Sequence, residues 1–314
     1  MGEYATIRGH KLYYQRDGEA GMPIILIHGT PSASFRWRPA QRLIAPYLET
    51  CAFDLIGMGK SDKPLKDWDY TFINDVHMIA ELMDHLGHQK MIICGDDWGG
   101  GIALLFASLY PQRTELCISI DPVCYDHWPV PELEAVGAAY FIEDDREFAA
   151  AMRDFPAKMA QTLRTMIYRP WKLTSLDQRE YIEPFVTTDY ARGGSQLNRD
   201  AGYAQLKLDA VRALAKRAAS MDPNWMIKLD FTRITAPTMI MWGARDIFMD
   251  PRGRWRLKND IINAPVRVQL IEEAGHLPGV ERPEFVAESI LDFVTEHRGL
   301  GAIAQPYRGG LVEE

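Results

Sequence analysis

Residues 95–99 read GDDWG and follow directly on the apolar run 91–94. The pattern glycine–any–nucleophile–any–glycine is typical of a sharp turn from a strand into a helix, which exposes the central side chain at the end of the strand. The central residue here is Asp97, so the nucleophile would be a carboxylate. Asp96 stands at the variable position before it, and we expect its side chain to point elsewhere.

Two more residues belong with this turn. Asp246 in the segment WGARDIF and His276 in the segment EEAGHLP each follow an apolar run. The chain order nucleophile, acid, histidine is the usual one for enzymes with such a turn. We therefore expect Asp97 to be the nucleophile, His276 the general base and Asp246 the acid that orients the histidine.

A carboxylate nucleophile restricts the possible reactions. It can displace a leaving group from saturated carbon, which leaves an alkyl ester on the enzyme. The histidine would then activate water against the carbonyl carbon of that ester. Attack on an ordinary carboxylic ester would give only an anhydride, so an esterase of the serine type is disfavoured. The chemistry indicated is the opening of a carbon–halogen bond or an epoxide, followed by hydrolysis.

Hydrogen-bond donors for this chemistry stand close by in the sequence. Backbone N–H groups of HGTP (28–31) and of Trp98 would form an oxyanion hole. The indole nitrogen of Trp98 can only donate a hydrogen bond, so in a dry pocket it could hold a departing halide.

A sheet must position these residues. Short apolar runs recur with helical stretches between them, at 23–29, 51–57, 91–96, 115–121, 237–243 and 266–276. Runs that are apolar throughout predict strands buried on both faces of a mostly parallel sheet, flanked by helices. The stretch YATIRGHKLYYQRDG predicts a hairpin at the start of the chain with its turn at Gly9, and helices are predicted at 74–87, 100–111 and 282–297.

No apolar run typical of a parallel strand occurs between residues 122 and 235, where helix formers and aromatic residues dominate. The runs begin again at residue 237. We interpret residues 1–121 and 236–299 as one α/β core, residues 122–235 as an inserted helical lid, and residues 300–314 as a C-terminal extension. Three lid tryptophans, Trp128, Trp171 and Trp225, are expected mainly to pack the lid.

The composition excludes several classes of function. The 314 residues carry a formal net charge of −8, which argues against nucleic-acid binding. The four cysteines have no paired spacing and suit a reducing compartment, and the chain has no cluster with metal-ligand spacing. No apolar run approaches the about 18 residues of a membrane span, and residues 1–18 lack the apolar core of a secretion signal. We expect a cytoplasmic monomer or homodimer that takes a small apolar substrate, with no cofactor, no metal and no membrane partner.

Four segments resemble haloalkane dehalogenases of the α/β-hydrolase superfamily: HGTPSASFRWR (28–38), DLIGMGKSDKP (54–64), DWGG (97–100) and YIEPF (181–185). The likeness covers most of the core, at 23–121 and 237–295, and is thin across the lid. It implies the α/β-hydrolase fold, with Asp97 as nucleophile, Trp98 as halide donor, His276 as base and Asp246 as its acid.

Two positions depart from the family pattern. Many members have asparagine after HG as a second halide donor, whereas this chain has Thr30, from which we expect the backbone N–H more than the hydroxyl. Members without that asparagine use a lid tryptophan, for which Trp128 is a candidate. Some members take the acid from the preceding core strand, where this chain has Asp121; we favour Asp246.

These observations predict hydrolytic dehalogenation of halogenated aliphatic compounds, which gives an alcohol and a halide. The alternative is an epoxide hydrolase with the same nucleophile. That enzyme needs a lid tyrosine to protonate the epoxide oxygen, and Tyr190 or Tyr203 could serve. The complete set of nucleophile, acid and base disfavours a receptor without catalysis, while the opening of a strained lactone stays open.

Overall fold

The structure is a computed structural model of the whole chain. It describes residues 2–18, 20–65, 70–124, 142, 144–151, 155–185, 208–219 and 229–299.

An eight-stranded sheet forms the centre of the described residues, in the order β1-β2-β4-β3-β5-β6-β7-β8. The strands are β1 (Glu3–Ile7), β2 (His10–Asp17), β3 (Ile24–Ile27), β4 (Thr50–Phe53), β5 (Met91–Asp96), β6 (Thr114–Ile120), β7 (Thr238–Gly243) and β8 (Val266–Ile271). Strands β1, β2 and β4 pair antiparallel, and all other neighbours pair parallel. The predicted hairpin and the six predicted parallel strands are therefore present.

Burial explains why the inner strands are apolar throughout. Every residue of β3, β4 and β5 is buried, because helices cover both faces of the sheet. Strand β8 lies at the edge, and only its last residue is fully buried.

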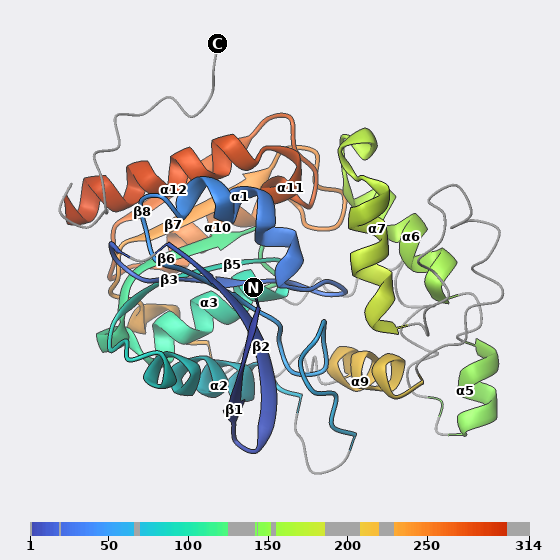
Figure 1. Cartoon of the computed structure of the whole chain (residues 1–314). Helices are drawn as coiled ribbons and strands as arrows, with labels where there is room; N and C mark the ends of the chain where they lie inside the picture. The colour runs from blue at the N-terminus through green and yellow to red at the C-terminus, as the bar shows by residue number, and fades with distance from the viewer. Residues whose placement is uncertain are drawn as a thin grey trace.

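The covering helices form one layer on each face (Figure 1). They are α1 (Arg38–Ile44) and α12 (Pro283–Arg298) on one face, and α2 (Phe72–His85), α3 (Trp98–Leu109) and α10 (Gly253–Asp260) on the other. Each layer builds a separate apolar core against the sheet. Helices α2, α3 and α12 agree with the three predicted helices, whereas α1 and α10 were not predicted, since both are short and polar on their outer faces.

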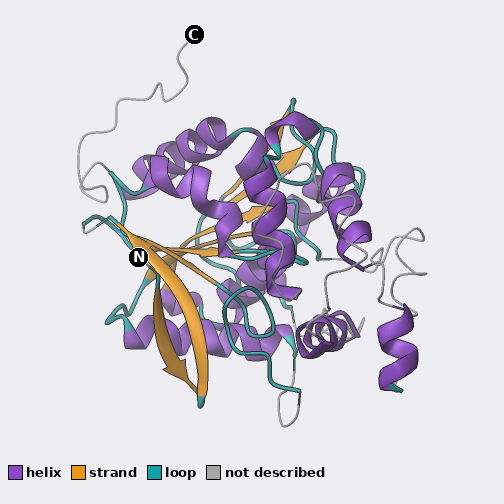
Figure 2. Cartoon of the chain, turned by 45° about the vertical axis from the view of Figure 1, so that its right-hand side comes forward, coloured by secondary structure: helices purple, strands orange, loops and turns teal. Residues whose placement is uncertain are grey.

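The described part of residues 122–235 is helical and contains no strand. It comprises α5 (Asp145–Ala151), α6 (Phe155–Met166), η3 (Pro170–Lys172), α7 (Ser175–Ile182), η4 (Glu183–Phe185), α9 (Leu208–Ala219) and η7 (Phe231–Arg233). Figures 1 and 2 show α5, α6, α7 and α9 grouped beside the sheet. The domain boundaries themselves stay a prediction.

The described residues also bear on two expectations about composition. None of their helices is long and apolar enough to cross a bilayer. Cys51, Cys94, Cys117 and Cys124 are all buried and form no disulfide.

Candidate active site

The turn between β5 and α3 has the geometry of a strained elbow. Asp97 takes φ 57° and ψ −122°, a conformation that costs free energy for a residue other than glycine. The glycines on either side allow the strand and helix to meet. A Cβ atom on Gly95 would lie 2.0 Å from the carbonyl oxygen of Gly99, and one on Gly99 would lie 2.2 Å from the carbonyl oxygen of Ile27.

Both carboxylate oxygens of Asp97 are held in position. The backbone N–H of Thr30 donates to Oδ1 at 2.7 Å, and Nε2 of His276 lies 2.8 Å from Oδ2. Thr30 can approach because Gly29 has no side chain, since a Cβ atom there would lie 2.1 Å from Oδ1. Asp97 is 1% exposed, so water scarcely competes for these contacts.

His276 is held from its other side by Asp246, which follows β7. Nδ1 of His276 lies 2.7 Å from Oδ2 of Asp246. Oδ1 of the same carboxylate accepts the backbone N–H groups of Phe248 at 2.8 Å and Met249 at 3.0 Å, which fixes its orientation. Burial alone would lower the pKa of His276, but the carboxylates of Asp246 and Asp97 raise this pKa well above its usual value.

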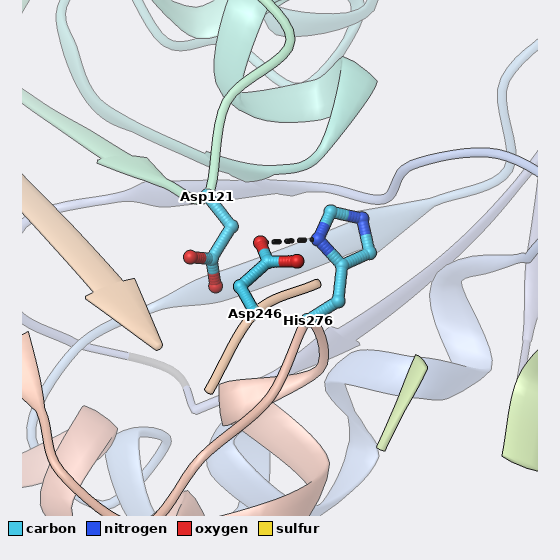
Figure 3. A group of neighbouring side chains, drawn as sticks. All are labelled: Asp121, Asp246 and His276. Carbon is cyan, nitrogen blue, oxygen red and sulfur yellow. Dashed lines mark hydrogen bonds and ion pairs between the residues drawn. The ribbon is translucent and has the colours of Figure 1, made fainter. Parts of the chain in front are cut away.

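Asp121, the competing acid, lies on the side of Asp246 that is away from His276 (Figure 3). Its Oδ1 accepts the backbone N–H of Gly243 at 2.8 Å, and its Oδ2 has no hydrogen-bond partner among the described residues. Burial, followed by the charge of Asp246, raises the pKa of Asp121 well above its usual value. Asp246, not Asp121, is therefore the carboxylate that contacts His276.

Asp121, Asp246 and His276 offer ligand atoms that all lie within 4.8 Å of one another, a grouping of a kind that metal ions use. Nδ1 of His276 is already bonded to Asp246, and the amide of Gly243 already occupies one oxygen of Asp121.

Two further predicted residues adjoin this site. Thr30 contributes its backbone N–H, as expected, while its buried Oγ1 has no hydrogen-bond partner among the described residues. Trp98 is buried at the start of α3, with its ring 5.5 Å from that of Phe72, measured between centroids.

Five predicted residues remain to be accounted for. Trp128, Tyr190, Tyr203 and Trp225 fall outside the described residues. The expectation that Trp171 packs the lid is wrong: it is 75% exposed, because the short helix η3 carries it on the surface.

Asp96 was expected to point away from Asp97, and the partner of its side chain was not anticipated. It forms a buried ion pair with Arg36, which lies in η1 (Ser34–Trp37). The only indication in the sequence was a charged residue inside the otherwise small and aromatic stretch SASFRW.

Glu281 is a second buried charge that was not anticipated, and it lies five residues after His276. The sequence shows how far Glu281 is from the histidine. It does not predict the hydrogen bonds of Glu281, because these go to backbone N–H groups, which every residue type except proline has.

A narrow crevice adjoins Thr30 and is lined by residues of core and lid, Pro31, Arg36, Leu163, Met166, Tyr181 and Leu277. A larger cleft of about 510 Å³ lies between β2 and α7, with Tyr13, Lys60 and Glu180 among its lining residues. Asp97, Asp246 and His276 line neither space, and the smaller one adjoins Asp97 through Thr30, whose N–H donates to that carboxylate.

Known proteins share this architecture. A family model described as alpha/beta hydrolase fold matches residues 22–283. A soluble epoxide hydrolase of Corynebacterium sp. (strain C12) is 27% identical over 299 residues, which cover 92% of this chain and 95% of the relative. A haloalkane dehalogenase of Mesorhizobium japonicum is 35% identical over 100 residues, 32% of each chain. The solved structure of epoxide hydrolase CorEH without ligand superposes with a TM-score of 0.74 at 23% identity and covers 95% of this chain and 99% of its own.

Proposed function

Since the chain belongs to the alpha/beta hydrolase fold family, we propose that it hydrolyses the carbon–halogen bond of a halogenated aliphatic compound through an ester formed on Asp97. The observation that carries this proposal is a carboxylate at a strained elbow, with an N–H donor on one oxygen and a histidine on the other. The 35% identity with a haloalkane dehalogenase over 100 residues supports it.

In the first step, Oδ2 of Asp97 attacks the carbon that carries the halogen. The new carbon–oxygen bond forms as the carbon–halogen bond breaks, and the halogen leaves with the bonding electrons as halide. The indole N–H of Trp98 would stabilise the halide. Oδ1 becomes the carbonyl oxygen of the ester and stays on the N–H of Thr30, where an oxyanion can later be stabilised.

Ester formation also prepares His276 for the second step. In the free enzyme, the charges of Asp246 and Asp97 raise the pKa of the imidazole, which favours its protonated form. The ester removes the negative charge of Asp97, so the pKa of His276 falls and its proton can leave to solvent. The neutral imidazole then takes a proton from water, which attacks the ester carbonyl, and gives that proton to the departing alkoxide.

Opening of an epoxide by the same nucleophile is the second candidate. It is favoured by the likeness to a soluble epoxide hydrolase, which extends over 95% of that protein. The ring carbon would be attacked by Asp97, and the epoxide oxygen would stay on the product as an alkoxide that needs a proton. Tyr190 and Tyr203, the proposed donors, lie outside the described residues.

The products distinguish the two candidates. Purified protein should release halide from 1,2-dibromoethane or 1-bromobutane, whereas an epoxide hydrolase would convert styrene oxide to its diol. Asp97→Asn should abolish halide release, while Asp84→Asn, a change of the same type on the surface of α2, should not. Diol formation without halide release would overturn the dehalogenase proposal.

A single turnover in heavy-oxygen water tests the ester itself. The alcohol of the first turnover should carry ordinary oxygen from Asp97, and the heavy isotope should enter the carboxylate. His276→Ala should accumulate the ester as a mass increase of the intact protein. A first product that already carries the heavy isotope would mean that water attacks the substrate directly.

A further inference from the structure

Glu281 is a buried carboxylate that bridges the His276 loop and the lid. It ends the short helix α11 (Pro278–Glu281) and is 1% exposed. Its Oε1 accepts the backbone N–H of Gly275 at 2.7 Å, and its Oε2 accepts the backbone N–H of Arg169 at 2.9 Å. One side chain thus holds both the residue before His276 and a lid residue that follows α6.

The two backbones also touch directly at this point. The N–H of His276 donates to the carbonyl oxygen of Met166 at 2.8 Å. A Cβ atom on Gly275 would lie 2.6 Å from that same oxygen and 2.7 Å from the nitrogen of Tyr168. Only a residue without a side chain allows this approach, so the His276 loop and lid residues 166–169 form one packed unit.

An outer set of charges surrounds the same junction. Glu273 pairs with Arg169 of the lid and with Arg282 at 3.0 Å. These side chains are more exposed than Glu281, and exposed ion pairs contribute little to stability. The buried carboxylate is therefore the main side-chain link.

Burying a carboxylate costs free energy unless hydrogen bonds replace its water. Burial raises the pKa of Glu281, and the N–H groups of Arg169 and Gly275 oppose that rise. The donors come from two separate segments, so the charge is stabilised only while the lid and the loop stay together.

The junction also reaches the crevice beside Thr30. Met166 and Leu277, the neighbours of this junction, line the same crevice as Thr30. A shift of the junction would therefore move both the base and part of the crevice wall.

We propose that Glu281 is a positioning residue that fixes lid residues 166–169 to the His276 loop, so that His276 keeps the geometry needed to activate water on the ester. The inference rests on the proposed two-step function. Because His276 acts as a base only in the second step, Glu281 should matter more for ester hydrolysis than for ester formation.

The test compares Glu281→Gln with Glu284→Gln, a matched change three residues further at an exposed position of α12. The glutamine keeps the size of the side chain but turns an N–H donor toward the N–H of Gly275 or Arg169. Misplacement of a catalytic group by about 1 Å costs on the order of 100-fold, so we expect ester hydrolysis to slow by about 10- to 100-fold. The initial burst of halide should stay near one per enzyme, and the ester should accumulate in the intact-protein mass. Glu284→Gln should behave as the wild type.

Two further variants keep the outcome decisive. Glu281→Asp, which keeps the charge but is shorter, should lie between wild type and Glu281→Gln. Gly275→Ala keeps Glu281 but places a Cβ atom 2.6 Å from the carbonyl oxygen of Met166 and 3.2 Å from Oε1 of Glu281. It therefore disturbs the same junction, and it should also accumulate the ester if Glu281→Gln does not fold.

The inference is overturned if the rates of ester formation and ester hydrolysis in Glu281→Gln both fall in proportion to the unfolded fraction that circular dichroism measures. It is also overturned if neither Glu281→Gln nor Gly275→Ala accumulates the ester. The proposed function fails separately, through absence of the ester in His276→Ala.

Discussion

Arg36 and Asp96 form an ion pair inside the protein, and Asp96 is the residue directly before the proposed nucleophile, Asp97. Their side chains are 2% and 6% exposed, and Arg36 also donates to Oγ of Ser32 at 3.1 Å. Burial raises the pKa of Asp96 to about 7, although the charge of Arg36 opposes the rise. A buried ion pair is often no more stable than apolar residues of the same size. Its position next to Asp97 therefore suggests that it balances charge at the site.

Asp96→Asn should slow ester formation, because it leaves the charge of Arg36 unbalanced beside Asp97. A cation there stabilises the free carboxylate and opposes its conversion to an uncharged ester. We expect the rate of halide release in a single turnover to fall about 10-fold, which corresponds to about 1.4 kcal/mol in the activation free energy. The double variant Arg36→Met/Asp96→Asn carries neither charge and should recover to within about 3-fold of the wild type. A double variant no faster than Asp96→Asn would show that the pair does not act through charge.

The protonation of His276 should depend on Asp97. The carboxylates of Asp246 and Asp97 raise the pKa of this buried imidazole, so Asp97→Asn, which removes one charge, should lower it. A raised histidine pKa stabilises the fold fully below the unfolded pKa of about 6.5, and this contribution disappears as the pH rises through the folded value.

Two measurements check the dependence on Asp97. The first is titration of the His276 ring by NMR in both proteins. The second is urea unfolding above pH 6.5, where the free energy of unfolding of the wild type should fall more with pH than that of Asp97→Asn. Equal titration curves would contradict the electrostatic coupling.

The site residues predicted best were those in short motifs at strand ends. Parallel strands bring their carboxyl ends to one edge of the sheet, so residues that follow β5 and β7 meet even though they are far apart in sequence. This is why the sequence alone predicts that Asp97 and Asp246 lie at the same edge of the sheet. The inner strands were equally predictable, because burial on both faces makes them apolar throughout.

The rest depended on contacts that sequence patterns do not encode. Asp121 and Asp246 follow neighbouring strands, so both carboxyls reach the same place, and only the hydrogen bond to His276 distinguishes them. Glu281 bonds to backbone groups, and Arg36 bonds to an aspartate in a distant segment. Short helices such as α10 lack a sustained apolar period and were missed for that reason.

The two acids should respond differently to the same substitution. Asp246→Asn removes the charge that orients His276 and should reduce turnover by about 100- to 10,000-fold. Asp121→Asn should reduce it by less than about 3-fold, since burial and Asp246 favour a protonated Asp121, and an amide N–H can replace that O–H. Steady-state turnover of each variant measures this difference, and a larger loss in Asp121→Asn would reverse the assignment.

Asp121→Asn should also raise stability at neutral pH. The raised pKa means that the folded state keeps a proton that the unfolded chain releases above about pH 4. The wild type therefore loses stability as the pH rises from there, and the asparagine variant does not. Urea unfolding at pH 4 and pH 7 should show the two proteins closest at pH 4. A variant that is less stable than the wild type at pH 7 would contradict the protonated state of Asp121.

The close approach of strand and helix at the elbow should make Gly99 irreplaceable. Its Cβ atom would lie 2.2 Å from the carbonyl oxygen of Ile27, and backbone cannot yield as a flexible side chain can. We expect Gly99→Ala to lower the free energy of unfolding by about 1–3 kcal/mol or more and to reduce halide release, because α3 and Asp97 must shift. Gly279→Ala is the matched control, since nothing lies within 4 Å of its Cβ atom and its backbone is helical. That change should be neutral or stabilise the protein by about 0.4–1 kcal/mol. Urea unfolding of both variants decides the matter: equal stability would mean that the elbow does not depend on contact between the two backbones.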